Sequence, residues 1–166
     1  MSLFRAIALI AAGAALAGCG FQPLYGKRDR GNVITEFAYV QVAPIKDRVG
    51  QRLRNELVQR LHAAGRSQVV KYRLVTELSE STSSLAVQKS ALATRANLSM
   101  TASYMLLSAG DGSSLINASE VVTVSYNLLD SEFATLMAER DARKRAVVSL
   151  SEDIRVRLGI YFDRQR

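Results

Sequence analysis

Residues 97–106 read Asn-Leu-Ser-Met-Thr-Ala-Ser-Tyr-Met-Leu, the clearest alternation of apolar and polar side chains in this chain. Successive side chains of a β-strand point to opposite faces, so the pattern predicts a strand with one buried and one polar face. We expect this strand to span residues 91–107. Its buried face would carry Leu98, Met100, Ala102, Tyr104 and Leu106.

Two further strands surround it in the sequence. Gly110-Asp111-Gly112-Ser113 is a turn sequence, and residues 115–126 alternate again, so the two runs predict a hairpin. Residues 68–78 alternate in the same way and predict another strand. Residues 79–84 are small and polar apart from Glu80, which predicts an irregular segment.

A first amphipathic helix is expected over residues 48–64, with Asp47 as its cap and Gly65 just beyond its end. Apolar residues recur every three or four positions and predict one buried stripe. The stripe contains Val49, Leu53, Leu57, Leu61 and Ala64.

A second helix closes the chain and is capped by Ser131. The charged run Glu-Arg-Asp-Ala-Arg-Lys-Arg at residues 139–145 favours a solvated helix surface over a binding patch, and residues 161–166 are expected to fray. The apolar side would carry Phe133, Leu136, Met137, Val147, Leu150, Ile154 and Leu158.

The remaining element is residues 33–42, which are rich in β-branched and aromatic residues and predict a strand that Pro44 ends. The expected order is therefore β-α-β-β-β-α. Two amphipathic helices can cover one face of a four-stranded, mostly antiparallel sheet, so the fold class is α+β.

The N-terminus resembles that of a bacterial lipoprotein. Arg5, an apolar run and Leu16-Ala17-Gly18-Cys19 form a signal peptide whose end is similar to a lipobox, with the single cysteine of the chain as the acceptor of lipid. The alternatives are a transmembrane anchor, for which the run is too short, and a buried cysteine. We expect a signal peptide at residues 1–18, a lipidated tether at 19–32 and one domain at 33–166. Gly20 after the cysteine favours the outer membrane.

The charge predicts an anionic partner. The chain has a net charge of +7, and removal of residues 1–18 takes away one basic residue and no acidic one, which leaves +6. Phosphate-rich lipids and acidic protein surfaces fit this charge. Export argues against nucleic acid as the partner. Lysines and arginines near the polar sheet edge are the candidate phosphate contacts, namely Lys71, Arg73, Lys89 and Arg95.

No catalytic constellation is present in the sequence. His62 is the only histidine, no Gly-x-Ser-x-Gly or P-loop sequence occurs, and no thiol remains once Cys19 is lipidated. The sequence therefore predicts neither an enzyme, nor a metal site, nor a bound cofactor.

Together these features resemble the lipopolysaccharide-assembly lipoprotein family LptE in its alphaproteobacterial form. The similarity lies in residues 19–26 (Cys-Gly-Phe-Gln-Pro-Leu-Tyr-Gly), in the Gly50-Gln51 run with Leu53 and Leu57, and in the closing helix. The resemblance implies two helices on a four-stranded sheet. It also implies a plug inside the LptD β-barrel that assists assembly of the barrel and binds lipopolysaccharide.

Two other classes of protein remain open. An auxiliary lipoprotein of an ABC-type lipid transporter would also be a tethered α+β domain, but it would associate with an inner-membrane ATPase. A lipid-anchored hydrolase would show an activity that depends on a single Ser or on His62.

Overall fold

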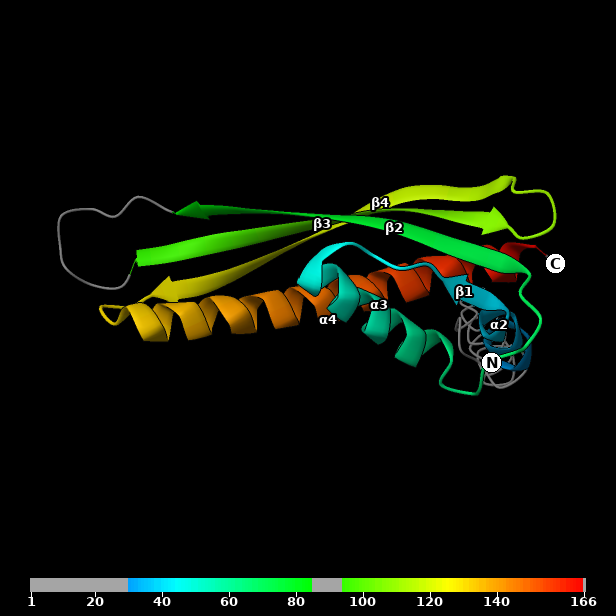
Figure 1. The fold of residues 1–166 in the computed structure, drawn as a ribbon, viewed down its shortest axis with the longest axis horizontal. Helices are drawn as coiled ribbons and strands as arrows, with labels where there is room; N and C mark the ends of the chain where they lie inside the picture. The colour runs from blue at the N-terminus through cyan, green and yellow to red at the C-terminus, as the bar shows by residue number, and fades with distance from the viewer. Residues whose placement is uncertain (1–29, 85–93, 166) are drawn as a thin grey trace, which may run out of the picture.

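The computed structural model describes residues 30–84 and 94–165, so the predicted signal peptide, Cys19 and Lys89 lie outside the described residues. Seven elements follow one another along the chain (Figure 1). They are α2 (Arg30–Ala38), β1 (Val40–Val42), α3 (Asp47–Leu61), β2 (Tyr72–Ser84), β3 (Thr94–Ser108), β4 (Ser114–Leu128) and α4 (Glu132–Arg164).

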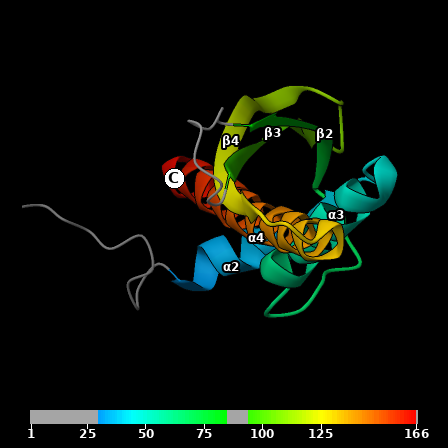
Figure 2. The same ribbon diagram turned by 90° about the vertical axis from the view of Figure 1, so that its left-hand side faces the viewer.

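The four strands form one mixed sheet in the order β1-β2-β3-β4. The short β1 pairs with β2 in parallel, whereas β2, β3 and β4 pair in antiparallel fashion. Figure 2 shows that the sheet arches over α4, with α3 and α2 also on its concave side. The predicted α+β class and the predicted hairpin are therefore confirmed, and a third helix is added.

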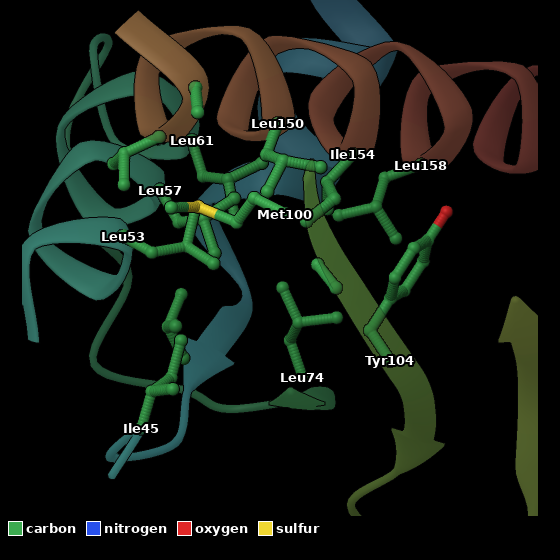
Figure 3. Packing of buried hydrophobic residues seen from close by; sticks show 14 of the residues in the cluster. Ile45, Leu53, Leu57, Leu61, Leu74, Met100, Tyr104, Leu150, Ile154 and Leu158 are labelled. Carbon is green, nitrogen blue, oxygen red and sulfur yellow. The ribbon is translucent and has the colours of Figure 1, made fainter. Parts of the chain in front are cut away.

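The core lies between the sheet and the two longer helices (Figure 3). The five predicted inward residues of β3 are all buried, at 2% exposure or less. The apolar stripes of α3 and α4 pack against these β3 residues. The central residues of both stripes are fully or almost fully buried. These residues are Leu53, Leu57 and Leu61 from α3, and Val147, Leu150, Ile154 and Leu158 from α4.

The predicted strand over residues 33–42 is wrong for most of its length. Residues 30–38 form α2, and only Val40–Val42 is a strand. Val33 and Phe37 are four positions apart, so they share one helix face, and both are buried. The Phe37 ring packs edge-on against Phe162 of α4 at 5.9 Å between centroids. Tertiary packing has overridden the β-propensity of this segment.

Both predicted ends of α3 need correction. Lys46 is the N-cap residue and makes no capping hydrogen bond with its side chain, while Asp47 already lies in the helix with φ of 66°. The helix ends at Leu61, so Ala64 is exposed and Gly65, with φ of 112°, lies in the loop that follows. Leu53, Leu57 and Leu61 of the predicted stripe are buried and Val49 is partly buried, so the stripe is confirmed except at Ala64.

The prediction that residues 79–84 are irregular is wrong, because these residues belong to β2. The strand both starts and ends later than expected. It begins at Tyr72 instead of residue 68 and continues to Ser84, with Ser79 opposite Thr101 and Ser83 opposite Asn97. The long alternating β3 supplies backbone partners for these small polar residues, so pairing decides the structure where local sequence does not.

Both ends of α4 also differ from the prediction. The helix continues to Arg164 without fraying at residue 161, because Phe162 is 6% exposed and contacts the rings of Phe37 and Tyr72. At the other end, Phe133, Leu136 and Met137 are exposed rather than buried. α3 lies beside the middle of α4, where Arg60 donates a hydrogen bond to Ser151, and does not reach the first turns (Figure 1).

Candidate functional site

An exposed group of apolar side chains surrounds the start of α4. We call Leu129, Phe133, Leu136 and Met137 the apolar tip; their exposed fractions are 48%, 71%, 41% and 45%. Single exposed apolar residues are ordinary, but a contiguous group at the end of a domain marks an interaction surface.

Local hydrogen bonds fix the turn that carries the apolar tip. The Ser131 hydroxyl accepts a hydrogen bond from the Ala134 backbone at 3.4 Å and so caps α4, as predicted. The Thr135 hydroxyl accepts from the Leu129 backbone nitrogen at 2.8 Å and donates to the Leu129 carbonyl at 3.1 Å. The exposed side chains are therefore held on an ordered turn.

A cleft lined by arginines lies next to the apolar tip. It has a volume of about 490 Å³ and lies between the start of α3, β2 and α4. We call it the arginine cleft, and it is lined by Arg48, Val49, Arg52, Glu80, Arg140 and Arg143.

Only Arg143 of these four arginines is neutralised within the described residues. Its guanidinium lies 3.1 Å from a Glu80 carboxylate oxygen and 2.7 Å from one of Glu139. The hydrogen bond to Glu80 is the main cause of a raised pKa of Arg143. Arg48, Arg52 and Arg140 make no ion pair in the described parts of the chain. The cleft therefore keeps excess positive charge.

The apolar tip and the arginine cleft follow each other along one helix. Arg140 comes one turn after Met137 and lies on the same side of α4 as Phe133, because residues three and four apart are neighbours on a helix. The neighbouring apolar tip and arginine cleft are together chemically complementary to an amphiphile that has apolar chains and anionic groups.

The structure separates the predicted phosphate contacts into two groups. Lys71 lies 3.4 Å from Glu36 and 3.9 Å from the centre of the Tyr39 ring, and Arg73 is close by on β2. Arg95 is at the opposite end of the sheet, because Arg73 pairs with Leu107, about 40 Å from Arg95 along β3. Arg95 is hydrogen-bonded to Asn127 at 3.4 Å, and Asn127 precedes the apolar tip by two residues.

Sequence reasoning missed the arginine cleft. The spacing of Arg48 and Arg52 places them on one side of α3, and Arg140 and Arg143 are part of the charged run that was interpreted as solvated helix. Each helix on its own shows a pair of closely spaced arginines in the sequence. The way in which the two helices lie together could not be predicted from either pattern.

The convex face of the sheet is mostly polar and carries few charges, although Met105 (40% exposed) and Val121 (60% exposed) also lie on it. Arg73, Glu77 and Arg95 are its charged residues on β2 and β3, and Ser125 donates a hydrogen bond to Asn97 across two strands at 2.7 Å. We call the following side chains the hydroxyl face: Ser79, Ser81, Ser83, Asn97, Ser99, Thr101, Ser103, Asn117, Ser119, Thr123, Ser125 and Asn127.

Residues 30–84 and 94–165 contain no cluster of three or more histidine, cysteine, aspartate or glutamate side chains arranged to hold a metal ion. Over the same ranges, no helix combines the length and apolarity that a membrane span requires.

Solved structures share this fold. A lipoprotein structure from Caulobacter crescentus CB15 superimposes with a TM-score of 0.64 at 24% identity, covering 81% of this chain and 98% of the other. A minor lipoprotein from Acinetobacter baumannii gives 0.56 at 13% identity, with 74% and 92% covered. Lipoprotein B from Nitrosomonas europaea gives 0.51 at 18%, with 70% and 77% covered. No curated protein matches the sequence significantly.

The fold is thus that of small α+β proteins described as lipoproteins. Residues 37–158 match the family model LptE, which is described as lipopolysaccharide-assembly. The match covers well over half of the chain, and the chain belongs to the LptE family.

Proposed function

We propose that this protein is an outer-membrane lipoprotein, anchored by lipid on Cys19, that fills the lumen of an LptD-like β-barrel and assists its assembly. In this role it binds lipopolysaccharide on the way to the cell surface and catalyses no reaction. Membership of the LptE family supports the assembly role. The identity of the partner, the ligand and the membrane is what we propose beyond family membership.

The hydroxyl face is the observation that carries the barrel-plug proposal. The lumen of an outer-membrane barrel is polar, and its lining residues alternate with the lipid-facing ones. A broad face of Ser, Thr and Asn side chains satisfies such a wall with hydrogen bonds and avoids the desolvation cost of buried charge. The two longer helices cover the other face of the sheet, which leaves the hydroxyl face available.

The apolar tip and the arginine cleft support lipopolysaccharide binding. Guanidinium groups pair with phosphate oxygens in bidentate fashion, and Arg48, Arg52 and Arg140 have no carboxylate partner among the described residues. Phe133 and Met137 offer apolar surface beside them for acyl chains. Arg95 and Lys89 remain candidate contacts, and Arg95 lies at the same end of the domain as the apolar tip.

Affinity purification from detergent-solubilised membranes tests the proposal. We expect a stoichiometric β-barrel partner, and we expect Thr101→Arg, at the centre of the hydroxyl face, to reduce its recovery. Asn55→Arg on the exposed side of α3 adds the same charge and is the matched control. Recovery of an inner-membrane ATPase complex instead of a barrel would select the ABC-type transporter subunit and reject the plug.

A further inference from the structure

We propose that a second, smaller hollow, formed by Arg54, Arg66 and Arg73, is a binding site for one phosphate group, either free or as the monoester headgroup of a lipid. The hollow is separate from the arginine cleft and does not depend on the proposed role as a barrel plug. We call it the three-arginine hollow.

Three separate parts of the chain bring the arginines together. Arg54 is on α3, Arg66 is on the loop that follows this helix, and Arg73 is on β2. The hollow has a volume of about 210 Å³, and residues 41–44, at the end of β1 and just after it, form another of its walls. Arg54 and Arg52 are only two positions apart on α3, so they point to different sides of the helix, and the two basic sites are distinct.

Nothing in the described part of the chain neutralises the positive charge of the hollow. Its lining contains three arginines and no acidic residue. Within residues 30–84 and 94–165, none of the three makes an ion pair, whereas Arg60, Arg143, Arg145 and Arg157 all do. Three like charges repel one another, so this arrangement is stabilised by an anion that lies among them.

Arg54 supplies a second, independent observation. Its Nε atom is buried and has no hydrogen-bond partner in the described structure. A buried donor without an acceptor is costly, and such groups are uncommon in native proteins. The Arg54 guanidinium is therefore short of acceptors, and an oxyanion in the hollow provides them.

The geometry favours phosphate over carboxylate. Guanidinium groups bind both through parallel N–H donors. Three guanidinium groups from three directions need an anion with at least three acceptor oxygens, which a phosphate monoester has and a carboxylate lacks. His62 does not compete for the ligand through its Nε2 atom, because this atom lies 2.9 Å from the Val40 carbonyl oxygen, which can only accept a hydrogen bond, so Nε2 donates to it.

A titration with inorganic phosphate tests the site in the full-length lipidated protein in detergent. At constant ionic strength, adjusted with sodium chloride, we expect a saturable rise in melting temperature, since a ligand bound only by the folded state stabilises it by mass action. Arg54→Gln combined with Arg73→Gln should weaken the phosphate affinity at least tenfold. Arg157→Gln with Arg164→Gln, an arginine pair on α4 that lines neither the hollow nor the arginine cleft, is the matched control.

Arg66→Gln provides a second variant that does not alter the packing, because Arg66 is exposed on a loop. It should weaken phosphate binding severalfold while the ligand-free melting temperature stays unchanged. Binding of the Cys19→Ala protein, which carries no acyl chains, to vesicles of phosphatidic acid in phosphatidylcholine, compared with phosphatidylcholine alone, identifies the source. Retention that depends on Arg54 and Arg73 supports a lipid headgroup, and a response to inorganic phosphate only supports a free anion.

Two results would overturn the proposal. One is a melting temperature that responds to phosphate no more than to chloride, with no retention on phosphatidic acid vesicles. The other is a phosphate response that the control pair Arg157→Gln and Arg164→Gln abolishes as fully as the variants of the hollow. Neither result would bear on the association with a barrel, which is read from co-purification.

Discussion

The side-chain amide of Gln51 donates a hydrogen bond to the backbone carbonyl of Ile45, at 3.2 Å, and so ties the first turn of α3 to the segment that leads into it. Its neighbour Gly50 packs closely against the side chain of the same residue, Ile45. A Cβ atom at position 50 would lie 2.6 Å from the Ile45 side chain, which is itself 2% exposed. The Gly50-Gln51 pair noted in the sequence thus holds Ile45 in place, through a hydrogen bond to its carbonyl and close packing against its side chain.

Gly50→Ala is therefore expected to destabilise the fold. An alanine normally stabilises a helix by about 1 kcal/mol relative to glycine. Here the new methyl group must displace a buried isoleucine, and overpacking typically costs about 1 to 3 kcal/mol. Urea denaturation should show a lower midpoint for Gly50→Ala. Gly110→Ala, where the nearest atom is the Ser108 hydroxyl at 3.9 Å, should unfold like the unmodified protein. A stabilised Gly50→Ala protein would contradict this packing.

Leu57→Ala tests the predicted stripe of α3. Leu57 is fully buried in the centre of the core, so removal of its side chain should cost roughly 2 to 5 kcal/mol through lost burial and the cavity left behind. Thermal and urea unfolding should both report this loss. Val69→Ala, at a side chain that is 63% exposed, should have little effect and serves as the control. A melting temperature within a degree or two of the unmodified protein would refute the placement of Leu57.

Long periodic patterns predicted their elements well. β3, β4 and the middle of both longer helices have the expected inward residues, since burial of a whole face strongly specifies the register. Short segments were predicted less well. The local preference of residues 33–38 is extended, yet a helix places Val33 and Phe37 on one buried face, from which Phe37 packs against Phe162 of α4.

The candidate site was less predictable than the fold for a related reason. Phe133, Leu136 and Met137 continue the apolar side of α4 in the sequence, but α3 begins too far along α4 to cover them. Likewise, the arginine cleft depends on how α3, β2 and α4 lie together. Periodicity reports which face of a helix is apolar, whereas only tertiary structure determines how far along the helix that face is covered.

Tyr104, which is buried, and Tyr72, which is partly buried, predict a loss of stability at high pH. Burial, with the nearby carboxylates of Glu36 and Glu120 respectively, raises the pKa values of Tyr72 and Tyr104 to about 12. An unfolded tyrosine ionises near pH 10. Between about pH 10 and 12 the folded state thus holds protons that the unfolded state releases, so stability is complete below pH 10 and falls as the pH rises.

The variant Tyr72→Phe with Tyr104→Phe should lose less stability between pH 9 and pH 11 than the unmodified protein does. The measurement is the urea midpoint at both pH values. Tyr39→Phe, which retains the phenols of Tyr72 and Tyr104, should follow the unmodified protein. An equal fall for all three proteins would show that these two tyrosines do not control the alkaline transition.

Cys19→Ala tests the predicted lipid anchor. Several acyl chains make a firm anchor, with about 0.8 kcal/mol for each buried methylene. The core of the described structure begins at Val33, so the variant should fold while failing to bind membranes. The measurement is whether the variant sediments with membranes from cells that express no barrel partner. Circular dichroism checks that the variant is folded. Continued sedimentation under these conditions would contradict lipid anchoring through this cysteine.

Reversal of charge at Lys89 and Arg95 tests the predicted lipopolysaccharide contacts. Arg95 lies beside Asn127, next to the apolar tip, so Lys89→Glu with Arg95→Glu should weaken binding of lipopolysaccharide several-fold without a change in melting temperature. Reversal is used because a single exposed ion pair is often worth less than about 1 kcal/mol. The difference should shrink with added salt, since the Debye length is about 8 Å at physiological ionic strength.

Two comparisons make this experiment specific. Arg157→Glu with Arg164→Glu produces the same change in net charge on the second half of α4, away from the apolar tip, and should bind lipopolysaccharide almost normally. Dephosphorylated lipid A should bind the unmodified protein and the Lys89, Arg95 variant about equally, because the lost attraction is to phosphate. If that variant binds intact lipopolysaccharide at low salt as tightly as the unmodified protein, the two residues are ordinary surface charge. Lys71 and Arg73 would then be the next candidates from the sequence, and the arginine cleft the next from the structure.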